Sequence, residues 1–367
     1  MSAVPFAIIG AGWRAEFYLR VAASLPERFR VTSVLTRDAA RAERVTTAFA
    51  VPVRATIDEV LADHPQLVVA CVPGEVAPRL LRELAAQDAA VLAETPPAAD
   101  LGSLARLAEL ARSSARIQVA EQYQFQPLHA ARLSLVRSGR LGTVSEAHVS
   151  AAHGYHGIDL IRRYLAVGFR PVTIVGRRFA SPLVVGPDRG GPPGGDRTEP
   201  SERVLAWLDF GDRLGVYDFA MEQYFSWVRS PSVVLRGDRG EIRDSTVRAL
   251  HDVRSPYVVE LTRRDVGHEG NLEGFHHAGI TLGDEWVYRN PFAPARLSDD
   301  EIAVATCLSK MAEYRDGGAA FCSLAEAAWD QELTIRLDEA VASGMPIRVA
   351  GTAWEALNGT PDGCRVP

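Results

Sequence analysis

The densest group of titratable side chains in the chain consists of His153, Tyr155, His156 and Asp159. On a helix that begins near Gly154, Asp159 would follow Tyr155 by four residues and His156 by three, so these side chains would share one face. The pKa of histidine lies near neutral pH, and a neighbouring carboxylate can orient the ring. The group therefore predicts general acid–base catalysis centred on His156, with His153 and Asp159 assisting.

The same spacing has a purely structural alternative. Asp159 also lies three and four residues before Arg162 and Arg163, which is the spacing of helical ion pairs. In that case the group marks only the first turn of a helix, and His153 lies just outside it. The residues themselves leave both interpretations open.

A second informative group is the glycine motif Gly10-Ala11-Gly12-Trp13-Arg14-Ala15. It lies between an apolar run at 6–9 and a helical pattern at 14–24, an order typical of dinucleotide-binding sites. Gly10 permits a tight turn, and Gly12 lets the backbone approach a pyrophosphate. Ala15 allows close packing, while the free N–H groups of the helix start face the phosphates. The alternative is a glycine turn in a domain that binds no ligand.

Short apolar runs and helical patterns alternate up to residue 124. We expect strands at 6–9, 31–35, 67–72, 90–93 and 117–120, with helices near 14–24, 39–49, 56–62, 76–87 and 101–114. This alternation predicts βαβ units and a doubly wound parallel sheet, a Rossmann-type NAD(P)-binding domain over 1–124. Ligands of such sheets bind at the C-terminal ends of the strands.

Candidate ligand contacts lie at that edge. Tyr123 follows the last predicted strand and would donate a proton or stack near a nicotinamide, or else fill a domain boundary. Glu94 ends another strand, where it would contact a cofactor ribose or serve as a structural acid. Thr36 and Arg37 stand where an acid usually binds the adenosine ribose. An arginine suits a 2′-phosphate, which slightly favours NADP over NAD, unless Arg37 is simply solvated.

The pattern changes after residue 124. We expect helices at 128–138, 154–165, 298–315 and 323–343. The stretch 170–263 is strand-like, with candidate strands at 204–210, 214–219 and 232–235. Glycine-bearing turns predict hairpins, and thus an open antiparallel sheet in an α/β domain over 125–350 for substrate binding and oligomerisation. The stretch 186–196 is predicted as a surface insertion, with an active-site lid as the alternative, and 351–367 as a loose tail.

Composition limits the partners. A net charge of −6 argues against nucleic acid and anionic membrane surfaces. No apolar run approaches membrane-spanning length, and the first strand begins almost at Met1, leaving no room for a signal peptide. The four cysteines show no C-x-x-C spacing, which indicates reduced thiols and no metal site. We expect a cytoplasmic protein.

With its motifs in this order, the chain resembles the Gfo/Idh/MocA oxidoreductases over roughly residues 5–350. Besides the glycine motif, the resemblance rests on Pro73, Glu94-Thr95-Pro96, QYQFQP at 122–127, Gly139-Arg140-Leu141-Gly142 and the stretch from Gly154 to Asp159. It implies NAD(P)-dependent redox chemistry on sugars, inositols or related polyols, with late helices returning to the first domain. It also implies cofactor contacts by Pro73, Glu94, Thr95 and Gln122, and roles for His156 and Asp159.

The chain departs from this family where chemistry is concentrated. Thr95 stands in place of the lysine of a usual Glu-Lys-Pro, and a hydroxyl is a poor acid or base at pH 7. Ala152, Ala77 and Gln124 stand at positions usually held by aspartate, histidine and arginine. The chain's single lysine, Lys310, falls on a distant predicted helix. The proton carrier is then expected to be His156, assisted by His153 or Tyr123.

Taken together, these residues predict an NAD(P)-dependent oxidoreductase that transfers a hydride to or from a small polar, sugar-like, keto or imine substrate. Two alternatives remain: a glycoside-cleaving enzyme that oxidises its substrate transiently, and a nucleotide-binding sensor or partner protein without catalysis. One face of the second sheet is expected to expose Val234, Tyr217 and Trp207. An apolar sheet face of this kind favours a homodimer or homotetramer.

Overall fold

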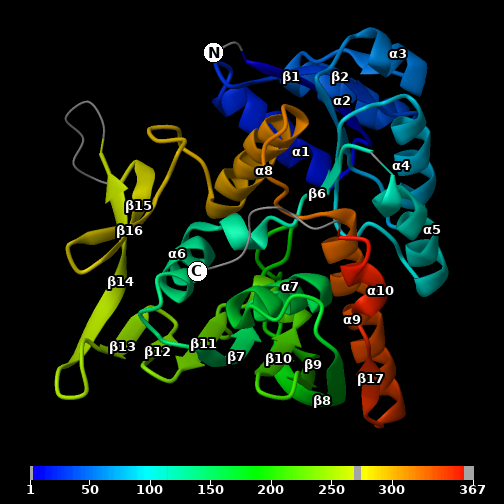
Figure 1. The fold of residues 1–367 in the computed structure, drawn as a ribbon. Helices are drawn as coiled ribbons and strands as arrows, with labels where there is room; N and C mark the ends of the chain where they lie inside the picture. Colours follow the sequence, from blue (N-terminus) through cyan, green and yellow to red (C-terminus); the bar gives the residue numbers. More distant parts are fainter. Residues whose placement is uncertain (1–2, 114, 268–273, 359–367) are drawn as a thin grey trace.

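The computed structural model describes residues 3–113, 115–267 and 274–358. Its first domain contains a six-stranded sheet of order β3-β2-β1-β4-β5-β6 in which every neighbouring pair is parallel (Figure 1). The strands are β1 (Val4–Ile9), β2 (Phe29–Leu35), β3 (Val53–Arg54), β4 (Leu67–Ala70), β5 (Val91–Ala93) and β6 (Ile117–Val119). The connecting helices are α1 (Trp13–Ser24), α2 (Ala39–Phe49), α3 (Ile57–Ala62), α4 (Ala77–Ala86) and α5 (Leu101–Arg112). The predicted doubly wound sheet is confirmed.

The burial of its strands explains why this domain could be predicted from the sequence. All residues of β4, β5 and β6 are buried, so most of them stand in continuous apolar runs, as strands covered by helices on both faces do. Strand β3 was missed because its two residues carry no pattern. The strand order reverses between β1 and β4, which opens a crevice above the C-terminal ends of the strands.

The second domain is built on an eleven-stranded sheet of order β16-β15-β14-β13-β12-β11-β7-β10-β9-β8-β17. Its strands are β7 (Val144–Ser150), β8 (Val172–Val184), β9 (Thr198–Asp209), β10 (Leu214–Ala220), β11 (Ser232–Gly237), β12 (Gly240–Arg243), β13 (Thr246–Leu250), β14 (Pro256–Val266), β15 (His276–Leu282), β16 (Glu285–Arg289) and β17 (Ile347–Val349). The expected open sheet is present, although β7 and β10 pair in parallel, so it is mixed rather than wholly antiparallel.

Helices cover one face of this sheet and link it to the first domain. They are α6 (Pro127–Arg137), α7 (Gly154–Leu165), α8 (Asp299–Arg315), α9 (Leu324–Ser343) and α10 (Thr352–Glu355), with short 3-10 turns η1 (Tyr123–Phe125) and η2 (Met221–Tyr224). Strands β12, β13 and most of β14 lie in the region 170–263 that was predicted as strand-like, but their limits were not predicted; β7, β15 and β16 were missed. In β14 apolar and polar residues stand in separate halves, so no strict two-residue alternation marks the strand.

The last two long helices return to the Rossmann domain, as the family resemblance implied. Helix α8 packs beside α1, and α9 packs against α5 and α7 (Figure 1). The buried amide of Gln118 on β6 accepts hydrogen bonds from the backbone N–H groups of Phe321 (2.9 Å) and Cys322 (3.0 Å). The two domains therefore meet along a shared core, and residues from both reach the same crevice.

The expected loose tail is wrong for its first part. Strand β17 pairs with β8, and helix α10 follows it. Trp354 is buried and its indole N–H donates to Glu332 at 2.7 Å. Residues 359–367 of the predicted tail lie outside the described part of the chain. Within that part, no helix has both the length and the apolar character needed to cross a bilayer.

The face of the second sheet away from the helices exposes apolar side chains. Trp207 is 60% exposed and Leu205 40%. Val234 lines a hollow on the same face, although the side chain itself is largely buried. Tyr217 was assigned to the wrong face: it is buried against α7, where its hydroxyl accepts from the Gly154 N–H at 2.8 Å.

Candidate functional site at the domain junction

The glycine motif forms an open cradle between β1 and α1. Gly10 has φ +105°, and a Cβ there would lie 2.1 Å from the carbonyl oxygen of Cys71, so only glycine fits. Gly12 caps α1 without a side-chain hydrogen bond, and a Cβ at Gly12 would meet nothing within 4 Å. The start of α1 thus borders open space at Gly12, and Ala15 packs in the core behind it. This arrangement fits the pyrophosphate of a dinucleotide.

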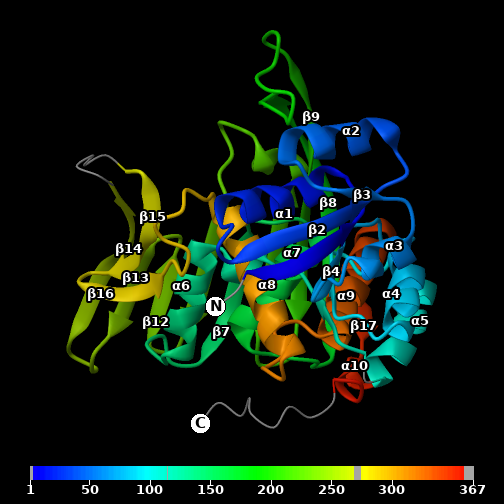
Figure 2. The same cartoon turned by 90° about the horizontal axis from the view of Figure 1, so that it is seen from above.

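A loop of the second domain reaches this cradle. The long β8–β9 hairpin projects from the second domain (Figure 2), and the Arg189 guanidinium lies 3.9 Å from the ring centroid of Trp13. The stretch 186–196 is exposed or half-buried throughout, as a surface insertion would be, and Arg189 within it contacts a residue of the glycine motif. A cation stands beside the predicted phosphate site.

Two predicted cofactor residues, Arg14 and Glu94, contact each other across the crevice. The Arg14 Nε donates to Glu94 Oε1 at 3.1 Å, and another of its nitrogens to Asp300 of α8 at 2.8 Å. The buried Tyr18 hydroxyl also donates to Glu94. The Gln122 amide, turned to satisfy its neighbours, accepts from Arg14 at 3.1 Å. These contacts tie α1, β5, β6 and α8 together at the edge where a nicotinamide ribose would lie.

The adenosine end of the edge is basic. Asp38 does not take the place of the missing acid, because its carboxylate caps α2 by accepting from the Arg41 N–H at 3.1 Å. The Thr36 hydroxyl in turn accepts from the Asp38 N–H at 3.2 Å. Arg37 is exposed and has no hydrogen bond or ion pair with any residue that the structure describes. Pro73 follows β4 at the same edge.

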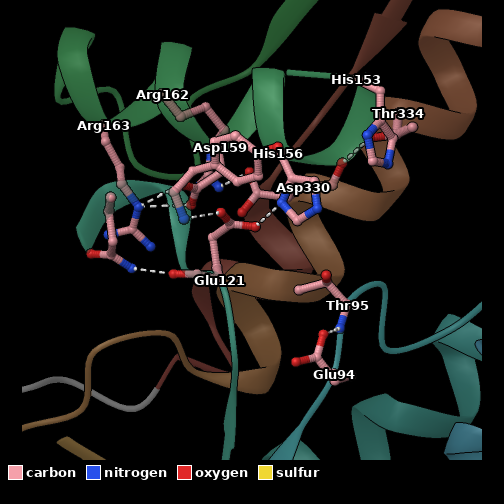
Figure 3. A network of polar contacts seen from close by, with 12 residues as sticks. Glu94, Thr95, Glu121, His153, His156, Asp159, Arg162, Arg163, Asp330 and Thr334 are labelled. Atoms are coloured by element: carbon pink, nitrogen blue, oxygen red, sulfur yellow. Dashed lines mark hydrogen bonds and ion pairs between the residues drawn. The ribbon is translucent and has the colours of Figure 1, made fainter. Parts of the chain in front are cut away.

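The closest pair of titratable groups joins the two domains. Glu121 follows β6, His156 lies in the first turn of α7, and Glu121 Oε2 is 2.6 Å from His156 Nδ1 (Figure 3). Glu121 is fully buried and its Oε1 accepts from the Tyr123 N–H at 3.0 Å. Burial raises the pKa of Glu121 to about 8 and lowers the pKa of His156 to about 4. Nδ1 is therefore occupied by the carboxyl, and Nε2 is the ring atom left for a ligand.

The predicted assistants of His156 surround it. The Tyr123 ring lies 4.5 Å from the His156 ring, centroid to centroid, and the His153 ring lies 5.0 Å away at its edge. The Tyr224 hydroxyl joins the two assistants, since it lies 3.2 Å from the Tyr123 hydroxyl and 2.7 Å from His153 Nδ1. His153 is exposed, whereas His156 retains only 6% exposure. Tyr224 reaches the site from η2.

The expected pairing of Asp159 with His156 is wrong. The Arg163 Nε donates to both oxygens of Asp159, at 2.7 and 2.8 Å, which is the structural alternative of the sequence analysis. Arg162 instead pairs with Asp330, a buried residue of α9 that sequence reasoning missed. Burial raises the pKa of each aspartate to about 7. Each of them has an arginine, and Glu121 has none; the orienting carboxylate is Glu121.

Thr95 occupies the position at which the sequence comparison with the family expects a lysine. Thr95 follows Glu94 on the loop below the Glu121–His156 pair (Figure 3), and its N–H donates to Glu94 at 3.3 Å. Ala152 is fully buried before α7. Lys310 lies 5.7 Å over the ring of Phe125 instead of beside His156. Among the described residues, no group of three or more histidine, cysteine or acidic side chains could hold a metal ion.

The fold and the cradle define a two-domain protein with a Rossmann-type dinucleotide-binding domain. Residues 4–123 match the model of the oxidoreductase family with an NAD-binding Rossmann fold, Gfo/Idh/MocA. A search of curated protein sequences found no significant match.

Solved structures share the fold over nearly the whole chain. An oxidoreductase from Agrobacterium radiobacter, in complex with NAD+, L-tartaric acid and magnesium, is 16% identical with a TM-score of 0.67, covering 96% of this chain and 99% of its own. A putative myo-inositol dehydrogenase from Sinorhizobium meliloti is 18% identical with a TM-score of 0.66, covering 95% and 100%. Levoglucosan dehydrogenase in complex with NADH is 13% identical with a TM-score of 0.67, covering 95% and 99%. At these identities the likeness shows a shared fold.

Proposed function

We propose that this chain is an NAD(P)-dependent oxidoreductase acting on a small polar substrate, of the sugar-like, keto or imine type. When bound, the nicotinamide supplies or accepts the hydride. The observation that carries the proposal is the placement of a titratable pair, Glu121 and His156, at the same sheet edge as the open α1 cradle. A phosphate site and a proton carrier at one crevice are what hydride transfer requires of a protein.

The residues divide into two tasks. The α1 amides, Arg14 and Gln122 would hold the dinucleotide, with Glu94 oriented toward its ribose by Arg14 and Tyr18. His156 would exchange a proton with the substrate oxygen or nitrogen through Nε2. That atom has no hydrogen-bond partner among the described residues and is not one of the fully enclosed polar atoms.

The polar surroundings of His153 fit a hydroxylated substrate. His153 is exposed, and its ring is held by the Tyr224 hydroxyl. A hollow of about 610 Å³ adjoins them, lined by Tyr224, Phe225 and Trp227 among others. Aromatic faces and ring nitrogens together suit a sugar-like ring, whose C–H faces pack on aromatics while its hydroxyls bond to polar groups.

The test combines binding with turnover. Calorimetry with NADPH and NADH should show binding to the isolated protein. A panel of aldoses, ketoses, polyols and cyclic imines, followed by absorbance of the reduced nicotinamide, should then show turnover with at least one member. Binding without turnover on any member, including glycosides assayed for cleavage, would favour a sensor and overturn the proposal. Glycoside cleavage without net change in the cofactor would instead establish the transient-oxidation enzyme.

A further inference from the structure

Oxidation of an alcohol by hydride transfer, or reduction of a carbonyl group, requires one proton to move, and this site has no lysine to carry it. His156 alone does not readily hold that proton as an imidazolium. Its ring is buried, and burial together with Arg14 lowers its pKa to about 4, so an imidazolium would be costly. A second group must therefore share the proton.

Glu121 is placed to do so. Its Oε2 lies 2.6 Å from His156 Nδ1, and its Oε1 is held by the Tyr123 N–H at 3.0 Å, so the carboxyl is fixed in register with the ring. The two neighbouring buried carboxylates, Asp159 and Asp330, are each neutralised by an arginine. Among the described side chains Glu121 has the His156 imidazole and no arginine as its ion-pair partner, so this acid can change its protonation without breaking an ion pair with an arginine.

We propose that Glu121 and His156 act as one proton-carrying pair that replaces the missing lysine, with His156 Nε2 as the atom that meets the substrate. The proposal rests on the proposed function. In the oxidising direction the substrate O–H bond breaks and an N–H bond forms at Nε2, while the Nδ1–H bond breaks and an O–H bond forms on Glu121. The ring begins and ends neutral, and the carboxylate becomes a carboxylic acid. Reduction runs the same two transfers backwards.

The environment of Glu121 and His156 determines which of their atoms carry hydrogen at neutral pH. The groups that act on it from the surrounding elements are Arg14, Glu94, Asp159, Arg163, Asp300 and Asp330. Burial is the largest influence and raises the pKa of Glu121 to about 8. At neutral pH the carboxyl therefore holds the proton and donates to Nδ1, which leaves the other hydrogen on Nε2. In this resting state the site can donate a proton to the substrate, which is what reduction requires.

This protonation state predicts opposite pH dependences for substrate oxidation and substrate reduction. Oxidation needs an ionised Glu121, so its rate should rise with pH through about 8. Reduction needs the protonated carboxyl, so its rate should fall over the same range. Glu121→Gln keeps the shape and can donate from its amide to Nδ1, but it can neither take nor give the proton. In the variant, neither the oxidation rate nor the reduction rate should change with pH over this range. Turnover should also fall by at least about tenfold, because one acid–base group is lost.

The experiment uses the full-length protein, with Glu146→Gln as matched control. Glu146 is a partly exposed carboxylate of β7 that pairs with Arg236, away from the site. Infrared difference spectra of parent and Glu121→Gln should show a protonated carboxyl that titrates near pH 8 in the parent and is absent from the variant. Nitrogen NMR of labelled histidine should place the His156 hydrogen on Nε2 at neutral pH. This second measurement needs only the parent, should the variant not fold.

The outcomes separate the two claims. An ionised Glu121 across this range, or an imidazolium at His156 with an ordinary histidine pKa, would overturn the pair. Turnover by the parent with a pH profile unchanged in Glu121→Gln would also overturn it and leave the proposed function standing. A shared proton seen by both spectroscopies in a protein that turns over nothing in the substrate panel would support the pair and remove the proposed function.

Discussion

Glu121, two residues after β6, and His156, in the first turn of α7, lie 2.6 Å apart between Oε2 and Nδ1, and this contact joins the Rossmann domain to the second domain. Both residues are buried, and Tyr123 between them on the chain holds the carboxyl through its N–H and covers the ring with its side chain. The pair therefore depends on the packing of the two domains against each other. Proton transfer and domain packing are linked at one point.

The buried carboxyl should also be visible in the stability of the protein. The pKa of Glu121 is raised from 4.5 to about 8. Between these values the folded protein keeps a proton that the unfolded chain has released, so this group makes the free energy of unfolding fall as pH rises. Urea titrations across this interval should show the parent losing stability relative to Glu121→Gln. A difference that stays constant with pH would contradict the raised pKa.

Arg37 should select the phosphorylated dinucleotide. It stands exposed and unpaired, within the described residues, at the loop that would face the adenosine ribose. We expect NADPH to bind more tightly than NADH, and Arg37→Ala to weaken NADPH binding about tenfold while leaving NADH nearly unchanged. Calorimetry on parent and variant measures this, with the exposed Arg30→Ala as control. NADH binding as tightly as NADPH in the parent would refute the assignment.

Arg189 should act on the cofactor from the other domain. Its guanidinium lies 3.9 Å from the ring centroid of Trp13, next to the phosphate cradle. Removing this cation by Arg189→Ala should weaken binding of either dinucleotide a few-fold, and more at low salt than at high salt because the interaction is screened. Arg197→Ala removes a cation from the same hairpin, one that pairs with Glu199, and should have little effect. Equal losses in both variants would point to general charge and not to this contact.

The outer face of the second sheet is proposed as the contact between subunits. Trp207 and Leu205 are exposed on β9, and a patch of this kind favours association. We expect a homodimer or homotetramer by light scattering at micromolar concentration, and a shift toward monomer in Trp207→Glu with an unchanged circular dichroism spectrum. A monomeric parent would show that this face has no such role.

Much of the fold follows from local patterns in the sequence. The parallel strands and helices of the first domain are legible because complete burial and 3.6-residue periodicity are both local signals. The limits of strand β14 were not predicted, because its side chains are mostly exposed and its position depends on pairing with β13 and β15. The parallel pairing of β7 with β10 likewise depends on how the whole chain packs.

In the functional site, too, local features were predicted from the sequence and contacts between distant segments were not. His156 was found from its motif, but its carboxylate partner was misassigned to Asp159, which is close in sequence, while Glu121 is 35 positions away. Helical spacing cannot rank a local ion pair against a contact between domains. One signal was available: Glu121 is an acid directly after a buried strand, at the edge where ligands bind. Nothing local pointed to Asp330 or to the contact of Arg189 with Trp13, since both depend on tertiary packing.

The most direct test of the account is label transfer with His156→Asn. NADPH carrying deuterium at the transferable position would be incubated with the substrate panel and the parent or the variant, and products would be analysed by mass spectrometry. We expect the parent to place the label on a carbon of at least one product, and His156→Asn to lower the rate by about 10²–10⁴. Cofactor affinity should be nearly unchanged, because His156 belongs to the second domain. Label transfer at the same rate in both proteins would contradict the assignment of His156 as proton carrier, and no transfer by the parent to any member would contradict the proposed oxidoreductase.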